Sequence, residues 1–221
     1  MKNYQKKEKR FFRPVSQNKN IVNGKLSVVH FLFYPNSEGL ETINDEENLA
    51  EILPNFWELK LRPNKSILQN RARRTNNNWW LLSEDRAWQR KKEPKLISTE
   101  FGKAGSFAFD KTGEFAVERG CAWIPKKEEK FSNDTYYAYL SIFCSDFFND
   151  LLGIYSKEIA SGWYLAKNFV ENIPMPDLTD DKLQALGELQ LLNEIGRKLS
   201  EGIEIDEVLL NQTVKTIYGI S

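Results

Sequence analysis

The chain has 221 residues, of which 41% are hydrophobic and 13% aromatic, and its formal net charge is zero. This composition excludes an intrinsically disordered chain, and the absence of any apolar run near the roughly 18 to 20 residues that cross a bilayer excludes a membrane-spanning segment. The basic N-terminus is followed by FFRPVSQNKN instead of an apolar signal core, so we expect a cytoplasmic protein without a membrane partner.

The first predicted elements are a strand and an interrupted helix. Residues 26–35 (LSVVHFLFYP) are β-branched and aromatic and end at a Pro-Asn-Ser turn, which predicts a strand. Residues 45–61 place Leu49, Leu53 and Phe56 at helical spacing. Because Pro54 lies inside this pattern, we expect a helix with a break.

A β-rich region and several helices follow. Residues 94–125 alternate with a period of two around the turn at 110–113 (DKTG), which predicts a hairpin or meander. Asp134 or Thr135 is expected to cap a helix whose apolar stripe continues to Leu151. Residues 182–199 and 205–218 predict an antiparallel helix pair. We therefore expect an α+β fold with a β-rich core and packed helices, divided into a domain at 1–177 and a helical extension at 178–221.

The zero net charge conceals a strong segregation of charge along the chain. Between Lys60 and Lys103 there are twelve basic and four acidic residues, which gives this segment a net charge of +8. From Asp177 to the C-terminus there are nine acidic and four basic residues, a net charge of −5. The two segments are expected to face different partners, unless the charges only solvate the surface.

Metal and cofactor chemistry find little support in the sequence. Cys121 and Cys144 lie in apolar contexts without metal-ligand spacing, and His30 is the only histidine, so we expect reduced core thiols and no zinc site. The glycine-containing segment FGKAGSF lies in the β-rich region without the helix that a dinucleotide site requires, and we expect no cofactor there.

Several motifs occur in an order that carries a family resemblance. They are FFRPVSQNKNI, HFLFYP, LPNFWELKLRPNKSILQNRARR, NNNWWLLSEDRAW, EPKLIS, GSFAFDKTGEFAVERGCAWIP, YYAYLSIFCSDFFNDLLGIYSK and GWYLAKNFVENIPMPDL. Together they resemble the C-terminal target-recognition (specificity) domain of TaqI-like adenine-specific DNA methyltransferases and of fused restriction-modification enzymes. The match covers residues 11–178.

The resemblance implies a division of labour between two domains. A separate catalytic domain binds S-adenosylmethionine and transfers the methyl group, while the specificity domain reads double-stranded DNA. The catalytic (Asp/Asn/Ser)-Pro-Pro-aromatic motif is missing from this sequence. We therefore expect a chain that is not an enzyme by itself, that carries no cofactor, and whose partners are double-stranded DNA and a methyltransferase catalytic domain.

Two segments supply the candidate DNA contacts. The first, residues 71–95, mixes bases suited to phosphates or guanine with asparagines suited to adenine, and the second, residues 157–168, combines a glycine turn with aromatic and basic residues. For the tryptophans at 79, 80 and 88, base stacking competes with core packing, and we expect at least two in the core. The candidate residues are Arg71, Arg73, Arg74, Asn76, Asn77, Asn78, Arg86, Arg90, Lys91, Lys92, Lys157, Ser161, Gly162, Trp163, Tyr164 and Lys167.

Two other functions remain open on the sequence. The chain could be half of a type I restriction specificity subunit, since those recognition modules also end in a proline-rich element followed by helices, although a complete subunit would have two repeats and long heptads. The neutral overall charge also permits a protein-interaction module that does not bind DNA. An upstream segment with the Pro-Pro-aromatic motif would distinguish the methyltransferase from both alternatives.

Overall fold

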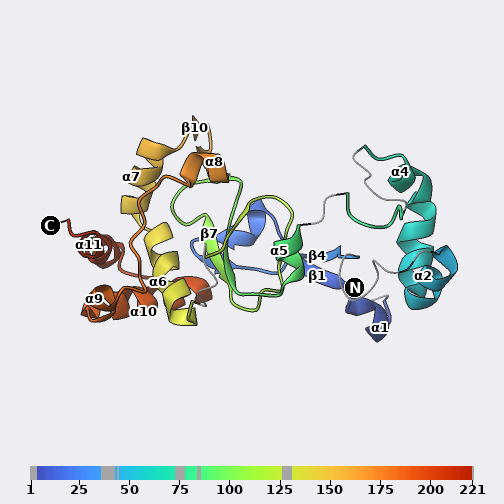
Figure 1. The fold of residues 1–221 in the computed structure, drawn as a ribbon, viewed down its shortest axis with the longest axis horizontal. Coiled ribbons are helices and arrows are strands. Elements are labelled where there is room, and N and C mark those ends of the chain that lie inside the picture. The colour runs from blue at the N-terminus through green and yellow to red at the C-terminus, as the bar shows by residue number, and fades with distance from the viewer. Residues whose placement is uncertain are drawn as a thin grey trace. The chain divides into compact units, whose positions relative to one another are not determined.

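The computed structural model describes residues 4–35, 43, 45–72, 78–83, 86–125 and 131–220. The fold is α+β, as predicted, and the chain forms two compact units (Figure 1). Unit 1 comprises Met1–Val15 and Val29–Lys92, and unit 2 comprises Ser16–Val28 and Glu93–Ser221. The chain therefore passes between the units three times, and each unit is described by itself.

Unit 1 combines a two-stranded pairing with a long helical segment. Strands β1 and β4 are antiparallel, with Phe12 opposite Phe33 and Val15 opposite His30. The predicted strand at 26–35 is wrong in extent, because the passage between units falls inside it and its two ends pair with different strands. The elements are α1 (Lys6–Lys9), β1 (Phe12–Ser16), β4 (His30–Phe33), α2 (Glu46–Ile52), α3 (Pro54–Phe56), η3 (Trp57–Leu61), η4 (Arg62–Asn64), α4 (Lys65–Gln69) and α5 (Ala87–Arg90).

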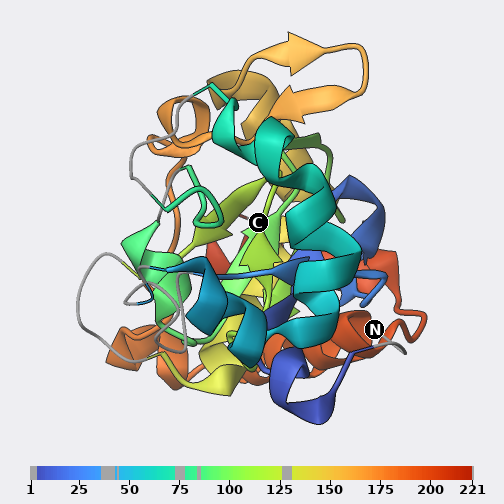
Figure 2. The same cartoon turned by 90° about the vertical axis from the view of Figure 1, so that its right-hand side faces the viewer.

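The predicted break at Pro54 is confirmed, because α2 ends at Ile52 and α3 begins at Pro54. Figure 2 shows the helical turns of this segment, which a second proline shapes. Pro63 has no amide hydrogen, and its ring conflicts with the carbonyl four residues earlier. The backbone responds with a π-helical stretch, η3, in which the Arg62 amide donates to the Trp57 carbonyl, followed by the 3₁₀ turn η4. The helical path thus continues to Gln69 despite the proline.

A buried carboxylate holds the start of this helical segment. Glu8 has no exposed surface, and its Oε1 accepts the Phe56 amide at 2.9 Å. Its Oε2 accepts the Gln5 amide at 2.7 Å and the Asn55 side-chain amide at 3.0 Å. Burial alone would raise the pKa of Glu8, but these hydrogen bonds outweigh it and lower the pKa. Glu8 therefore caps a helix that begins 46 residues later in the chain.

The core of unit 1 is largely aromatic. Trp79 and Trp80 are both buried, which confirms that two of the three tryptophans considered belong to the core. The Trp79 indole N–H donates to Glu46 Oε1 at 2.9 Å, so its polar atom is also satisfied. The buried cluster consists of Phe11, Leu49, Leu53, Phe56, Leu61, Trp79, Trp80 and Leu81.

Unit 2 is built on a three-stranded antiparallel sheet of order β7-β5-β9. Residues 94–125 are rich in strands, as predicted. The expected hairpin turn at residues 110–113 is wrong, because β7 pairs with the earlier strand β5 and β8 lies outside this sheet. A second sheet has the order β10-β11-β6, and β2 pairs with β3. The strands are β2 (Ile21–Val22), β3 (Lys25–Leu26), β5 (Lys95–Ser98), β6 (Phe101–Gly102), β7 (Phe107–Asp110), β8 (Ala116–Val117), β9 (Cys121–Trp123), β10 (Glu158–Ile159) and β11 (Gly162–Tyr164).

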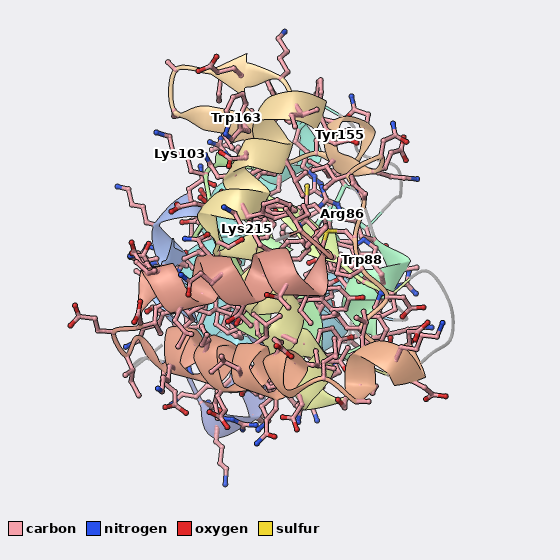
Figure 3. All side chains as sticks on the ribbon, turned by 90° about the vertical axis from the view of Figure 1, so that its left-hand side faces the viewer. Arg86, Trp88, Lys103, Tyr155, Trp163 and Lys215 are labelled. Carbon is pink, nitrogen blue, oxygen red and sulfur yellow. The ribbon has the colours of Figure 1, made fainter. Side chains whose placement is uncertain are left out.

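The helices of unit 2 share one core with its sheet. Residues of α6, α7, α10 and α11 join strand residues such as Leu96 and Phe107 in a single buried cluster, and Figure 3 shows α10 and α11 side by side. Helix α10 approaches α6 so closely that a Cβ added to Gly196 would lie 1.9 Å from the Tyr137 carbonyl oxygen. The helices are α6 (Asn133–Phe143), α7 (Asp146–Tyr155), α8 (Lys167–Val170), α9 (Asp181–Gln184), α10 (Gly187–Glu201) and α11 (Glu207–Ile217).

The single helix predicted from residue 134 or 135 to 151 is two helices. Ser132, not Asp134 or Thr135, caps α6, with its hydroxyl oxygen accepting the Thr135 amide. Ser145 caps α7 by accepting the Phe148 amide. The apolar spacing continues across this break, which explains why the pattern alone does not reveal it.

Candidate nucleic-acid interface

The basic segment of unit 1 divides into residues that stabilise the fold and residues that face solvent. Arg71 is half-buried and donates from Nη2 to the Leu81 carbonyl oxygen. The side-chain amide of Asn78 donates to the Ile43 carbonyl oxygen at 3.1 Å. Both side chains thus bind backbone carbonyl oxygens of the same unit. Arg73, Arg74, Asn76 and Asn77 lie outside the described residues.

The remaining cations of this segment are exposed on α5 and the residues after it. Arg86 is the residue before the first helical turn, and Arg90 is the last residue of α5. Lys91 and Lys92 follow directly. Between residues 86 and 92 all four charged side chains are basic, and all four are exposed. We call these four residues, Arg86, Arg90, Lys91 and Lys92, the α5 basic cluster.

A buried arginine that the sequence reasoning missed supports this cluster. Arg13 of β1 is 2% exposed, donates from Nη1 to the Gln89 carbonyl oxygen of α5, and lies 4.9 Å from the Tyr34 ring centroid. Burial raises the pKa of the Tyr34 hydroxyl, while the charges of Arg13, Arg90 and Arg86 oppose this shift. Three guanidinium groups therefore contribute positive potential near Tyr34. In the sequence, the only sign of this buried arginine is its position within the FFRPVS segment that forms β1.

Lys95 has to be removed from the predicted surface. It is 3% exposed, and its ammonium group lies 2.5 Å from Asp110 Oδ2. The same group donates to the Gly113 carbonyl oxygen at 3.1 Å, and Asp110 Oδ2 also accepts the Phe115 amide at 3.0 Å. Lys95 thus belongs to a buried, hydrogen-bonded ion pair that links β5 to β7, where a DNA phosphate has no access.

In unit 2 the second candidate segment forms β10, β11 and the start of α8. Tyr164 stacks on Phe169 with the ring centroids 4.9 Å apart and meets Phe101 edge to face at 4.8 Å. The Lys157 ammonium group lies 5.9 Å from the Tyr164 ring centroid. Lys157 is exposed, and so is Lys167, which pairs with Glu171 at 3.7 Å. The cations of this segment therefore face solvent beside a half-buried aromatic group.

The glycine and the tryptophan of this segment serve the fold. Gly162 is buried with φ at +133°, and an added Cβ would lie 2.5 Å from the Gly102 carbonyl oxygen. Its conformation is required by the close approach of β6, while the neighbouring Ser161 is exposed. Trp163 lies at the base of the β10–β11 hairpin beside α7 (Figure 3), where its ring atoms come within 3.6 Å of a Cβ placed on Gly153.

The two candidate segments belong to different units, and the structure describes each surface within its own unit.

Over the described part of the chain, no group of three or more His, Cys, Asp and Glu residues could hold a metal ion. Burial raises the pKa of the Cys144 thiol to about 12. Within those same residues, no helix is long and apolar enough to cross a membrane.

The chain matches no protein-family model and no curated protein.

Proposed function

We propose that this chain binds double-stranded DNA as the target-recognition domain of a TaqI-like adenine methyltransferase, with the catalytic domain as a separate partner. The observation that carries the proposal is the α5 basic cluster. Four exposed cations without an intervening acid suit the phosphate backbone, whose neutralisation releases condensed counterions and supplies most of the affinity for DNA. The buried Arg13 anchors α5 beneath the cluster.

The exposed residues of unit 2 supply the second part of the proposal. Lys157 and Lys167 are exposed, and in the proposal they contact phosphates, which orient a protein on DNA without reading its sequence. Base readers require polar side chains that reach the groove edges, and Ser161, next to Gly162, is the exposed polar residue of this turn. A lone recognition domain lacks the catalytic half of the cleft, so we expect dissociation constants near 10⁻⁴ to 10⁻⁶ M, the approximate range of sequence-independent binding.

Salt-dependent DNA binding tests the proposal directly. Fluorescence anisotropy of a labelled duplex, measured over a series of salt concentrations, gives the slope of log affinity against log salt. In the double variant Lys91→Ala/Lys92→Ala this slope should fall by about 0.9 for each lost phosphate contact. The matched control is Lys182→Ala/Lys198→Ala, which removes two exposed cations from the acidic C-terminal segment. If both variants retain the wild-type affinity and slope, the α5 basic cluster is only a solvated surface.

The proposal also assigns the chemistry to the partner. Because the sequence lacks both a glycine-rich cofactor loop followed by a helix and the Pro-Pro-aromatic motif, the isolated chain is expected not to bind S-adenosylmethionine and not to methylate DNA. Titration calorimetry with the cofactor checks the first expectation. Micromolar binding would contradict the division between recognition and catalysis.

A second candidate function, protein interaction, is favoured by apolar side chains near the end of α10 and the start of α11. Val208 is 67% exposed and Ile203 51% exposed, and Leu209 is also exposed. The acidic segment around them would repel phosphates, so this surface suits a protein partner better than DNA. Val208→Glu should leave DNA affinity unchanged and should weaken binding of a catalytic domain added in trans.

A further inference from the structure

A groove in unit 2 lies outside both candidate DNA-binding segments. Its volume is about 780 Å³. Its walls come mainly from the β2–β3 segment, from the corner between α6 and α7, and from the loop that joins α10 to α11 (Figure 3). These three segments are described without a gap, over residues 21–26, 143–147 and 199–211. The charge of the groove can therefore be taken from its own residues.

Turns and helix ends hold the walls of the groove. Asn23 and Gly24 form the β2–β3 turn with φ of +46° and +83°, the left-handed values of a two-residue hairpin turn. A Cβ on Gly24 would lie 2.8 Å from Leu199 Cβ, so the turn packs directly on α10. At the end of α10 the Ile203 amide donates to the Lys198 carbonyl oxygen at 2.9 Å, as in a Schellman motif. The groove is thus preformed, and a ligand would lose little affinity to ordering of its walls.

The groove presents apolar side chains that the rest of unit 2 leaves exposed. Val22 of β2 is 64% exposed and Ile203 is 51% exposed, and both line the groove. Leu199 and Leu210 add buried apolar side chains to the same lining. Apolar surface that gathers in this way marks a site of protein contact. Covering Val22 and Ile203 would also be favourable by itself.

Two carboxylates without a partner border this apolar surface. Glu204 and Glu207 line the groove and are exposed. Within the described part of the chain, neither side chain makes a hydrogen bond or an ion pair. Asp206, which lies between them, differs because it caps α11 by accepting the Leu209 amide at 3.0 Å. Glu204 and Glu207 are thus free to pair with a cation from another molecule.

The lining as a whole is acidic. Besides Glu204 and Glu207 it contains Asp146, whose Oδ2 accepts the Asn211 side-chain amide at 3.1 Å. Lys25 is the basic residue among the described lining residues. Three acids against one base give the lining a net charge of −2. A ligand with positive groups is therefore attracted to the groove, and a phosphate is repelled.

We infer that this groove docks a segment of a partner protein in which apolar side chains are flanked by lysine or arginine. The apolar side chains of that segment contact Val22 and Ile203, and its cations pair with Glu204 and Glu207. The inference rests on the protein-interaction candidate proposed above and adds the chemistry of the partner to it. It does not depend on DNA binding, since the groove and the α5 basic cluster belong to different units.

Synthetic peptides test the inference on the full chain. The probe is a fluorescein-labelled peptide that repeats leucine, lysine and serine, and its two counterparts carry glutamate in place of lysine or serine in place of leucine. Fluorescence anisotropy should show that the leucine–lysine peptide binds at least about ten-fold more tightly than either counterpart. Its affinity should fall with rising salt, because salt screens the pairing of exposed charges.

A matched pair of apolar variants locates the binding. Ile203→Ser should weaken binding of the leucine–lysine peptide by about ten-fold or more, the contribution of burying one such side chain. Ile154→Ser, at a 73% exposed position of α7, should leave the affinity unchanged. Both positions are exposed, so both variants should keep the urea midpoint of the wild type.

A matched pair of charge variants gives a second readout. Glu204→Gln/Glu207→Gln should weaken binding of the same peptide by roughly two- to ten-fold and should remove most of its salt dependence. Asp181→Asn/Glu194→Gln removes two exposed carboxylates from α9 and α10 and should retain both the affinity and the salt dependence. A role limited to folding would not change the salt dependence.

The outcomes separate this inference from the proposed functions. Equal binding of the three peptides, or equal effects of Ile203→Ser and Ile154→Ser, would overturn the groove while salt-dependent binding of a duplex still supported DNA recognition. If Val208→Glu weakens binding of a catalytic domain and Ile203→Ser does not, the protein-interaction candidate stands without the groove.

Two further results would assign the groove to another occupant. Loss of duplex affinity in Ile203→Ser would assign it to DNA. Self-association of the wild type that Ile203→Ser abolishes, measured by sedimentation velocity, would assign it to a second copy of the chain. Either result would overturn the docking of a basic partner segment.

Discussion

Replacing Glu8 by glutamine should destabilise unit 1 although the side chain keeps its size. The amide oxygen can still accept the Phe56 amide, but the new NH₂ group takes the place of Oε2. Two donors, the Gln5 amide and the Asn55 side-chain amide, then lose their acceptor. An orphaned buried donor costs about 1 to 3 kcal/mol, and both of these hydrogen bonds are only partly buried, so we expect a total loss of about 1 to 3 kcal/mol in the free energy of unfolding.

The pH dependence of this loss has a definite sign. Because hydrogen bonds lower the pKa of Glu8 in the folded state, its stabilisation is fully present above the unfolded pKa of about 4.3. It disappears as the pH falls through the folded pKa, which lies lower. The difference between wild type and Glu8→Gln should therefore be constant from neutral pH to about 4.3 and should shrink below it.

Urea unfolding followed by tryptophan fluorescence measures this loss, since four of the six tryptophans belong to unit 1. Amide hydrogen exchange over residues 55–61 locates it at the capped helix. Glu51→Gln, at an exposed position of α2, is the control. A cost for Glu8→Gln within about 0.5 kcal/mol of the control, the usual range for surface substitutions, would refute the capping role.

Three further predictions concern unit 2. Lys95→Ala should cost about 3 to 5 kcal/mol because it leaves a buried carboxylate without its ion partner, and in urea unfolding the double variant with Asp110→Ala should cost less than the sum of the single variants. Gly196→Ala should lower the free energy of unfolding by about 1 to 3 kcal/mol, since the methyl group meets the backbone of α6. The control Gly153→Ala should be neutral or stabilising by up to about 1 kcal/mol. Equal melting temperatures of the two variants would contradict the close contact between α10 and α6. Cys144, with a pKa of about 12, should be alkylated much more slowly at pH 8 in the folded protein than in urea, as peptide mass spectrometry can measure.

Local signals predicted where the longer helices lie, because their evidence is contained in short stretches of sequence, but they did not reveal the break between α6 and α7. Pro54 within an apolar helical spacing indicated both a helix and its interruption. Amphipathic spacing predicted the C-terminal helix pair, but the first helix, expected from residue 182, is divided into α9 and α10. Strand pairing was not local. The Asp-Lys-Thr-Gly sequence has the composition of a hairpin turn, but β7 pairs with β5, and the local pattern around the turn does not specify that partner.

The candidate interface, like the strand pairing, could be predicted from the sequence only in part. Charge density indicated the exposed α5 basic cluster, but it could not separate Lys92 from Lys95, only three residues later. Burial of Lys95 depends on Asp110, and burial of Arg13 depends on Tyr34 and α5. These partners are distant in the sequence, so the charges that stabilise the fold and the charges that face solvent looked alike.

The β2–β3 hairpin has a consequence for the order of folding during synthesis. It lies between the two segments of unit 1 in the chain but packs in unit 2, where a Cβ on Gly24 would lie 2.8 Å from Leu199 Cβ. Leu199 leaves the ribosome about 175 residues later, a delay of about 10 to 35 s at bacterial or eukaryotic elongation rates. All of unit 1 is available well before that moment. The nascent hairpin therefore waits through the synthesis of unit 1 for β7, whose Ala108 forms a bridge with Gly24, and it gains its contact with α10 last.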